Sequence, residues 1–150
     1  MNPSQIRQLL TKILVDIMFF GGIVSCIVVP FILPWIMSVT GAPPQYQIVY
    51  TAVLLGAGLS AVYILYQLKR MFKTLVGGNP FVGQNVTCLR KCAVASAVIA
   101  LVFIVRLIFW FTIAASVIAI IFSLLSLFCL TIKDLFKQAV AYKEETDWTV

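Results

Sequence analysis

The side chains best suited to chemistry in this sequence are its four cysteines, Cys26, Cys88, Cys92 and Cys129. Cysteine pairs can exchange disulfides or bind zinc, but the chain has no histidine, so a zinc site would need thiolates alone. Cys88 and Cys92 also have three residues between them, whereas zinc ligands are usually separated by two. We therefore expect free thiols that pack as small apolar side chains, with no metal and no cofactor.

The other reactive groups are too sparse for the common enzyme mechanisms. The absence of histidine excludes histidine-based triads and helical zinc-protease motifs. Of the five acids, Asp16 and Asp134 border apolar stretches and the other three lie in the C-terminal tail. A mechanism that needs two facing carboxylates therefore has no place in the apolar part of the chain, and we predict a non-enzymatic protein.

Arg106 is the only charged residue in the long apolar stretch 92–132. An ionisable residue inside a membrane often marks a transport pathway, so a small permease or exporter subunit is the alternative function. A long basic side chain close to a membrane surface can also extend to the headgroups or support helix packing. We favour this second interpretation for Arg106.

The composition of the chain indicates the environment in which these residues are held. The chain is 62% hydrophobic and 11% charged, whereas soluble domains are roughly 45–50% apolar and about 25% charged. So much apolar surface indicates a protein with lipid as its solvent. The net charge of +6 lies mainly beside the apolar runs, which favours contact with anionic headgroups over direct binding of nucleic acid.

The apolar runs predict four membrane crossings, at about residues 13–37, 48–68, 92–109 and 113–132. The stretch 92–132 would be about 60 Å long as one helix, twice the hydrocarbon thickness, so it must fold back. We place this turn at residues 108–113. Four aromatic residues then share one interface, as in an aromatic belt. These residues are Trp35, Tyr46, Tyr50 and Trp110.

The basic residues predict the orientation. With both termini in the cytoplasm, ten of the eleven basic residues lie on the cytoplasmic side, in the N-terminal segment, a loop at 69–91 and a C-terminal helix at 133–145. The prediction is an all-α, single-domain (1–150) integral membrane protein of the plasma membrane, folded as an antiparallel four-helix bundle. Small residues four apart are expected at its helix contacts. They are Gly21/Ser25, Ala52/Gly56/Ser60, Ala93/Ala97 and Ala115/Ala119/Ser123.

The centre of the basic loop has two interpretations. Gly77 and Gly78 could end one helix, and Asn79-Pro80 could begin the next, with Gln84 or Asn85 as a later start. Alternatively, the loop and the C-terminal helix form a docking surface, and the tail acids could pair with the basic residues of the loop. The candidate partner-binding residues are Asn79, Pro80, Phe81, Arg90, Lys91 and Trp148.

These residues also carry a family resemblance. Gly78-Asn79-Pro80-Phe81, Asn85-Val86, Leu89-Arg90-Lys91 and Tyr142-Lys143-Glu144-Glu145 resemble the domain of unknown function 2975 family of small bacterial and archaeal membrane proteins. The resemblance covers nearly the whole chain, including its four helices. It implies no established activity and no residue role, but members are often encoded beside small helix-turn-helix DNA-binding proteins.

Two residues depart from the pattern of that family. Trp148 stands where an aliphatic residue is expected, and Gly83 where an acidic one is common. The first departure would matter if the tail docks into an apolar pocket. We therefore expect a regulatory membrane protein that binds a cytoplasmic partner, with a small helix-turn-helix regulator as the candidate. Its other expected partners are the lipid bilayer and, in a homo-oligomer, further copies of itself.

Overall fold

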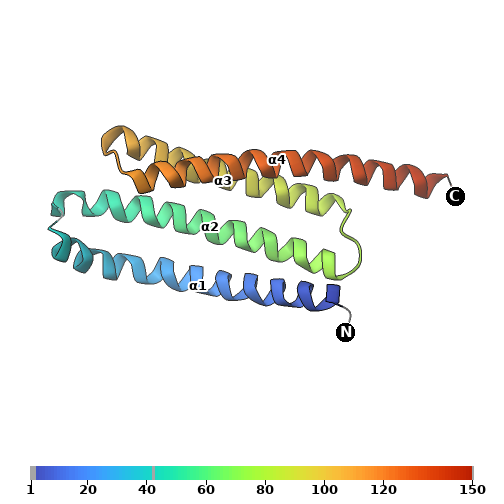
Figure 1. The fold of residues 1–150 in the computed structure, drawn as a ribbon, viewed down its shortest axis with the longest axis horizontal. Helices are drawn as coiled ribbons and strands as arrows, with labels where there is room; N and C mark the ends of the chain where they lie inside the picture. Colours follow the sequence, from blue (N-terminus) through green and yellow to red (C-terminus); the bar gives the residue numbers. More distant parts are fainter. Residues whose placement is uncertain (1–2, 42, 150) are drawn as a thin grey trace.

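The structure is a computed structural model that describes residues 3–41 and 43–149. It contains four long helices, α1 (Pro3–Thr40), α2 (Gln47–Val76), α3 (Gly83–Phe109) and α4 (Ile113–Trp148), and a short 3₁₀ helix, η1 (Pro44–Tyr46). The described residues form no strand. Successive helices run antiparallel, and α1 begins at the end of the molecule where α4 finishes (Figure 1). The predicted all-α four-helix bundle is confirmed.

All four helices are long and apolar enough to cross a membrane. α1 has 38 residues and α4 has 36, so each is well over 50 Å long at about 1.5 Å per residue. Both therefore extend beyond a hydrocarbon layer of about 30 Å. Most of their large apolar side chains are exposed in the isolated chain, as expected for helices that face lipid.

The predicted turn within 92–132 is confirmed, because α3 ends at Phe109 and α4 begins at Ile113. The segment 69–91, expected as a loop, is mostly helical, and only residues 77–82 connect α2 to α3. Helix α3 begins at Gly83 rather than at Pro80, since Val82 before it is extended. The interpretation that placed Pro80 in the first turn of the helix is therefore wrong, and the later start is close to the observed one.

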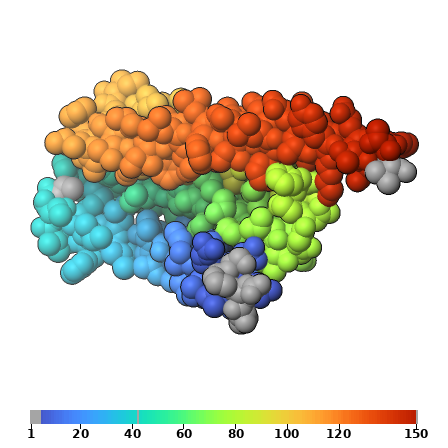
Figure 2. All heavy atoms as spheres, turned by 45° about the vertical axis from the view of Figure 1, so that its right-hand side comes forward, coloured from blue at the N-terminus to red at the C-terminus, as the bar shows by residue number. Residues whose placement is uncertain are grey.

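Helix packing follows the order of the chain: α1 packs on α2, α2 on α3, and α3 on α4. The most buried helix is α3. Its Ile99 and Phe103 pack on Ala115 and Ala119 of α4, where small side chains allow the two helices to approach closely. The space-filling view shows α4 along one side of the molecule and α1 on the other (Figure 2).

The small residues at the α1–α2 contact are not the ones predicted. A Cβ atom added at Gly21 or Gly56 would meet nothing within 4 Å. At Gly58, by contrast, a Cβ would lie 2.8 Å from the sulfur of Cys26, and at Gly22 it would lie 3.0 Å from a methyl group of Val62. The close approach in α2 is therefore displaced by two residues from the predicted ladder, while Ala115 and Ala119 are buried as expected.

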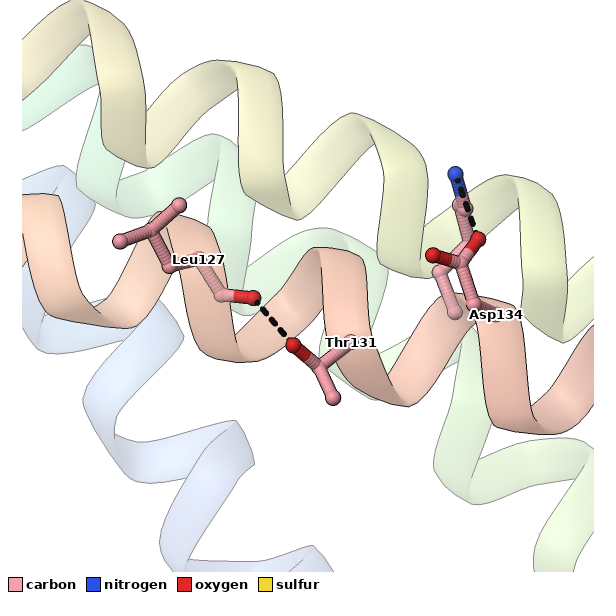
Figure 3. Close-up of polar contacts among 4 residues, drawn as sticks. Leu127, Thr131 and Asp134 are labelled. Atoms are coloured by element: carbon pink, nitrogen blue, oxygen red, sulfur yellow. Dashed lines mark hydrogen bonds and ion pairs between the residues drawn. The ribbon is translucent and has the colours of Figure 1, made fainter.

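Charged residues of α1, α2 and α4 lie toward the same end of the molecule. Asp16 of α1 forms an ion pair with Lys69 of α2 at 2.9 Å, and Lys133 pairs with Asp134 on α4 at 3.0 Å. Figure 3 shows this second pair one turn beyond Thr131, whose hydroxyl donates to the Leu127 carbonyl. Lys133 lies about 30 Å along α4 from Ile113 at roughly 1.5 Å per residue, which is the thickness of a hydrocarbon layer.

Candidate functional site

The polar residues of the molecule gather where α2 passes into α3 and α4 runs past them. We call this region the charged end and define it as residues 69–91 together with 133–148. The opposite end carries the aromatic residues Trp35, Tyr46 and Trp110. Tyr46 and Trp110 meet edge to face with ring centroids 5.2 Å apart. One end of the molecule is therefore charged and the other aromatic, as expected if the two ends lie on opposite sides of a membrane.

A buried asparagine fixes the connection between α2 and α3. Asn85 is only 2% exposed, and its amide nitrogen donates to the Pro80 carbonyl at 2.7 Å. Its side-chain oxygen accepts from the Thr74 hydroxyl of α2 at 2.9 Å. Gly78 turns the chain with a positive φ of 78°, a backbone conformation in which glycine has no steric penalty. Asn85 therefore ties this loop to both helices, a role that its place in the sequence pattern did not indicate.

The same loop docks on α4. The rings of Phe81 and Phe136 lie 5.5 Å apart between centroids, a geometry typical of stabilising aromatic pairs. Lys143, two turns farther along α4, donates a hydrogen bond to the side-chain oxygen of Asn79. Phe81 remains 45% exposed, so this contact leaves part of its ring free. Loop and helix thus form one continuous surface, called here the loop–helix surface and made of residues 79–81 and 136–148.

Helix α4 continues well past the rest of the charged end (Figure 1). Trp148 lies about 22 Å beyond Lys133 at roughly 1.5 Å per residue and is 89% exposed. Tyr142 is also mostly exposed. The expected pairing of the tail acids with the loop is not observed, because the ion pairs between described residues join only Asp16 to Lys69 and Lys133 to Asp134.

The structure divides the six candidate partner-binding residues among three places. Asn79, Pro80 and Phe81 lie in the loop that docks on α4. Arg90 and Lys91 lie instead on an open groove between α2 and α3. Trp148 sits at the far tip of α4, beside Glu144 and Glu145 of its own helix and Thr149, which follows it.

Arg106 lies near the aromatic end, as its position in the sequence predicted. Its guanidinium carbon is 5.1 Å from the ring centroid of Tyr50, a cation–π distance. Both residues line a cavity of about 520 Å³ between α2 and α3, which Tyr46 and Trp110 also border. The stacked ring gives Arg106 a packing partner, and the cavity gives it space for an anionic or aromatic ligand.

The cysteines are packed as small side chains. Cys88, Cys92 and Cys129 are buried, Cys26 is half-buried, and all four are free thiols. Cys92 and Cys129 share a small core with Ala93, which Leu68 and Leu125 border. The expectation that the thiols fill apolar space therefore agrees with their positions.

Comparison with known proteins gives one match. A family model described as "Protein of unknown function (DUF2975)" matches residues 27–150. No curated protein and no solved structure matches the chain. The matched residues include α2, α3, α4 and the whole loop–helix surface.

Proposed function

Since the chain belongs to the DUF2975 family of proteins of unknown function, we propose a role from its own geometry. It is a non-enzymatic regulatory protein of the plasma membrane that binds a cytoplasmic partner through the loop–helix surface. In this proposal the charged end faces the cytoplasm, so both termini are cytoplasmic. The support for this orientation is the excess of basic residues at that end.

One observation carries the proposal. Trp148 is 89% exposed about 22 Å beyond Lys133, where water rather than lipid would surround it. Tryptophan and tyrosine are enriched among the residues that dominate binding energy at interfaces. A partner that covers Trp148 and Tyr142 would remove their large apolar area from water, and the docked loop would supply a second contact at Phe81.

The charges at the tip indicate what kind of partner fits. Glu144, Glu145 and Asp147 lie within one turn of Trp148 and form no ion pair among the described residues. Small DNA-binding proteins carry basic surfaces that match such acids. We therefore propose a small helix-turn-helix regulator, held at the membrane when its basic surface contacts the tip and released when DNA competes for it. The gene neighbours that the family resemblance implies support the same choice.

The test is affinity capture of the tagged full chain from the membranes of its host, quantified by mass spectrometry. Trp148→Ala should lose a small DNA-binding protein that the native chain retains. The matched control is Trp35→Ala, which removes the same side chain at the opposite end of the bundle, where Trp35 is 68% exposed. Equal capture by both variants, or capture of no cytoplasmic protein by the native chain, would contradict the proposal.

A second function is favoured by the cavity at Arg106. A space of about 520 Å³ that is lined by one cation and four aromatic side chains would suit a lipophilic anion. The chain would then be a small permease or exporter subunit, acting as an oligomer. Arg106→Gln should abolish the efflux of such an anion from cells, whereas unchanged efflux would remove this alternative.

A further inference from the structure

Arg90 and Lys91 line a groove at the charged half of the bundle. The groove has a volume of about 580 Å³ and opens between α2 and α3. Its remaining wall comes from the polar residues Ser60, Tyr63 and Thr87 and from a row of apolar ones. The apolar residues are Leu59, Val94, Ala95 and Val98.

The depth of the groove matches the edge of a bilayer. Arg90 lies about 30 Å from Trp110 along α3 at roughly 1.5 Å per residue, so the two residues mark opposite faces of one hydrocarbon layer. Val94 and Val98 lie about 6 Å and 12 Å deeper than Arg90, on the side toward Trp110. The groove is therefore cationic at headgroup depth and apolar at acyl-chain depth.

The two cations are available to a ligand. Both are exposed, and the ion pairs formed within the described part of the chain involve neither of them. No acidic side chain lines the groove. The hydroxyls of Ser60 and Thr87 already donate to carbonyls of their own helices, at 2.9 Å and 3.2 Å. An anion in the groove would therefore take its hydrogen bonds mainly from the guanidinium and the ammonium groups, and the Tyr63 hydroxyl is a further donor on the same wall.

We propose that this groove binds one anionic phospholipid. Its phosphate lies between Arg90 and Lys91, and an acyl chain follows Leu59, Val94 and Val98 toward the middle of the bilayer. Charge complementarity selects this occupant, because a zwitterionic lipid would leave the two positive charges without a net negative partner. The apolar wall favours a lipid over a soluble phosphate, since a soluble anion would leave that wall uncovered.

The test is native mass spectrometry of the full chain in detergent with dioleoylphosphatidylglycerol. Dioleoylphosphatidylcholine serves as the reference, because it has the same chains and no net charge. We expect one phosphatidylglycerol to be retained in preference to phosphatidylcholine. The double variant Arg90→Gln/Lys91→Gln should lose about 30-fold in affinity for it, since each basic group near a membrane surface contributes roughly fivefold. Arg90→Lys/Lys91→Arg should keep most of the affinity.

Two controls separate the groove from the general charge of the protein. Lys73→Gln/Lys137→Gln removes the same charge from two exposed residues of the charged end that do not line the groove, and it should retain the preference. Val94→Phe keeps every charge and fills the apolar part at a residue that is 58% exposed, so the fold tolerates it while lipid retention falls.

Three outcomes would overturn the proposal. Equal retention of the two lipids by the native chain would show that charge does not select the ligand. An equal loss in the Lys73/Lys137 control would show that any surface charge suffices. Displacement of the lipid by millimolar inorganic phosphate would identify a site for soluble anions instead of a lipid site.

Discussion

Gly58 provides the sharpest test of how α1 packs on α2. A Cβ at this position would lie 2.8 Å from the Cys26 sulfur, a separation at which something must move. Gly56, two residues earlier in the same helix, has no atom within 4 Å of such a Cβ. Valine at either position has the same effect on helix propensity, so the difference between Gly58→Val and Gly56→Val isolates the contact with α1.

The expected difference follows from overpacking. Extra carbon atoms forced into a filled contact typically cost about 1–3 kcal/mol. For a chain of 150 residues, 1 kcal/mol changes the unfolding midpoint by roughly 2–4 °C, so Gly58→Val should unfold about 2–12 °C below Gly56→Val. Cys26→Ala removes the opposing sulfur and should recover part of this loss when combined with Gly58→Val.

The assay is heating of the purified variants in dodecyl maltoside, followed by size-exclusion chromatography to measure the fraction that stays monodisperse. Cys26→Ala alone completes the double-mutant cycle and corrects for its own effect on stability. If Gly56→Val is the less stable variant, or if Cys26→Ala recovers nothing, the register of α1 against α2 described above is wrong.

Three further substitutions test the remaining contacts with the same assay. Asn85→Ala should cost about 2–3 kcal/mol, because it removes the two hydrogen bonds that hold the loop, and an unchanged midpoint would refute this role. Gln67→Met should raise the midpoint by roughly 2–8 °C, since the Gln67 side-chain oxygen is buried without a hydrogen-bond partner among the described residues; a lower midpoint would show that the amide is satisfied in the membrane. Arg106→Gln should lower the midpoint by about 1–4 °C through loss of the Tyr50 stack, and an equal loss in Arg106→Lys would show that the planar guanidinium matters more than the charge.

The features that could be predicted from the sequence are those that a lipid environment determines. The turn before Ile113 was located without any glycine or proline, because a stretch of that length cannot stay in one hydrocarbon layer. The positions of Arg106 and Trp110 near the turn between α3 and α4 followed from the same argument and from the preference of tryptophan for membrane interfaces. Such constraints act on each helix separately, so their effect can be predicted without knowing which helices pack against it.

The features that the sequence did not predict depend on how the helices rotate and slide against each other. α2 is apolar on several faces, so its pattern cannot tell whether Gly56 or Gly58 meets α1. The hydrogen bond from Lys143 to Asn79 joins residues that are far apart in the chain. They meet because α4 runs past the loop between α2 and α3. Asn85 lies in one of the motifs that resemble the family, but its two hydrogen-bond partners lie in α2 and in the loop. The motif alone therefore could not predict these contacts.

The most direct test of the proposed function is photo-crosslinking in living cells, with benzoylphenylalanine replacing one tryptophan at a time. At position 148 the probe would sit at the exposed tip of α4, and at position 35 it would sit near the end of α1, at the opposite end of the bundle. We expect the probe at Trp148 to form an adduct with one cytoplasmic DNA-binding protein and the probe at Trp35 to form none. Adducts only with other copies of the chain, or the same adduct from both positions, would contradict the proposed function.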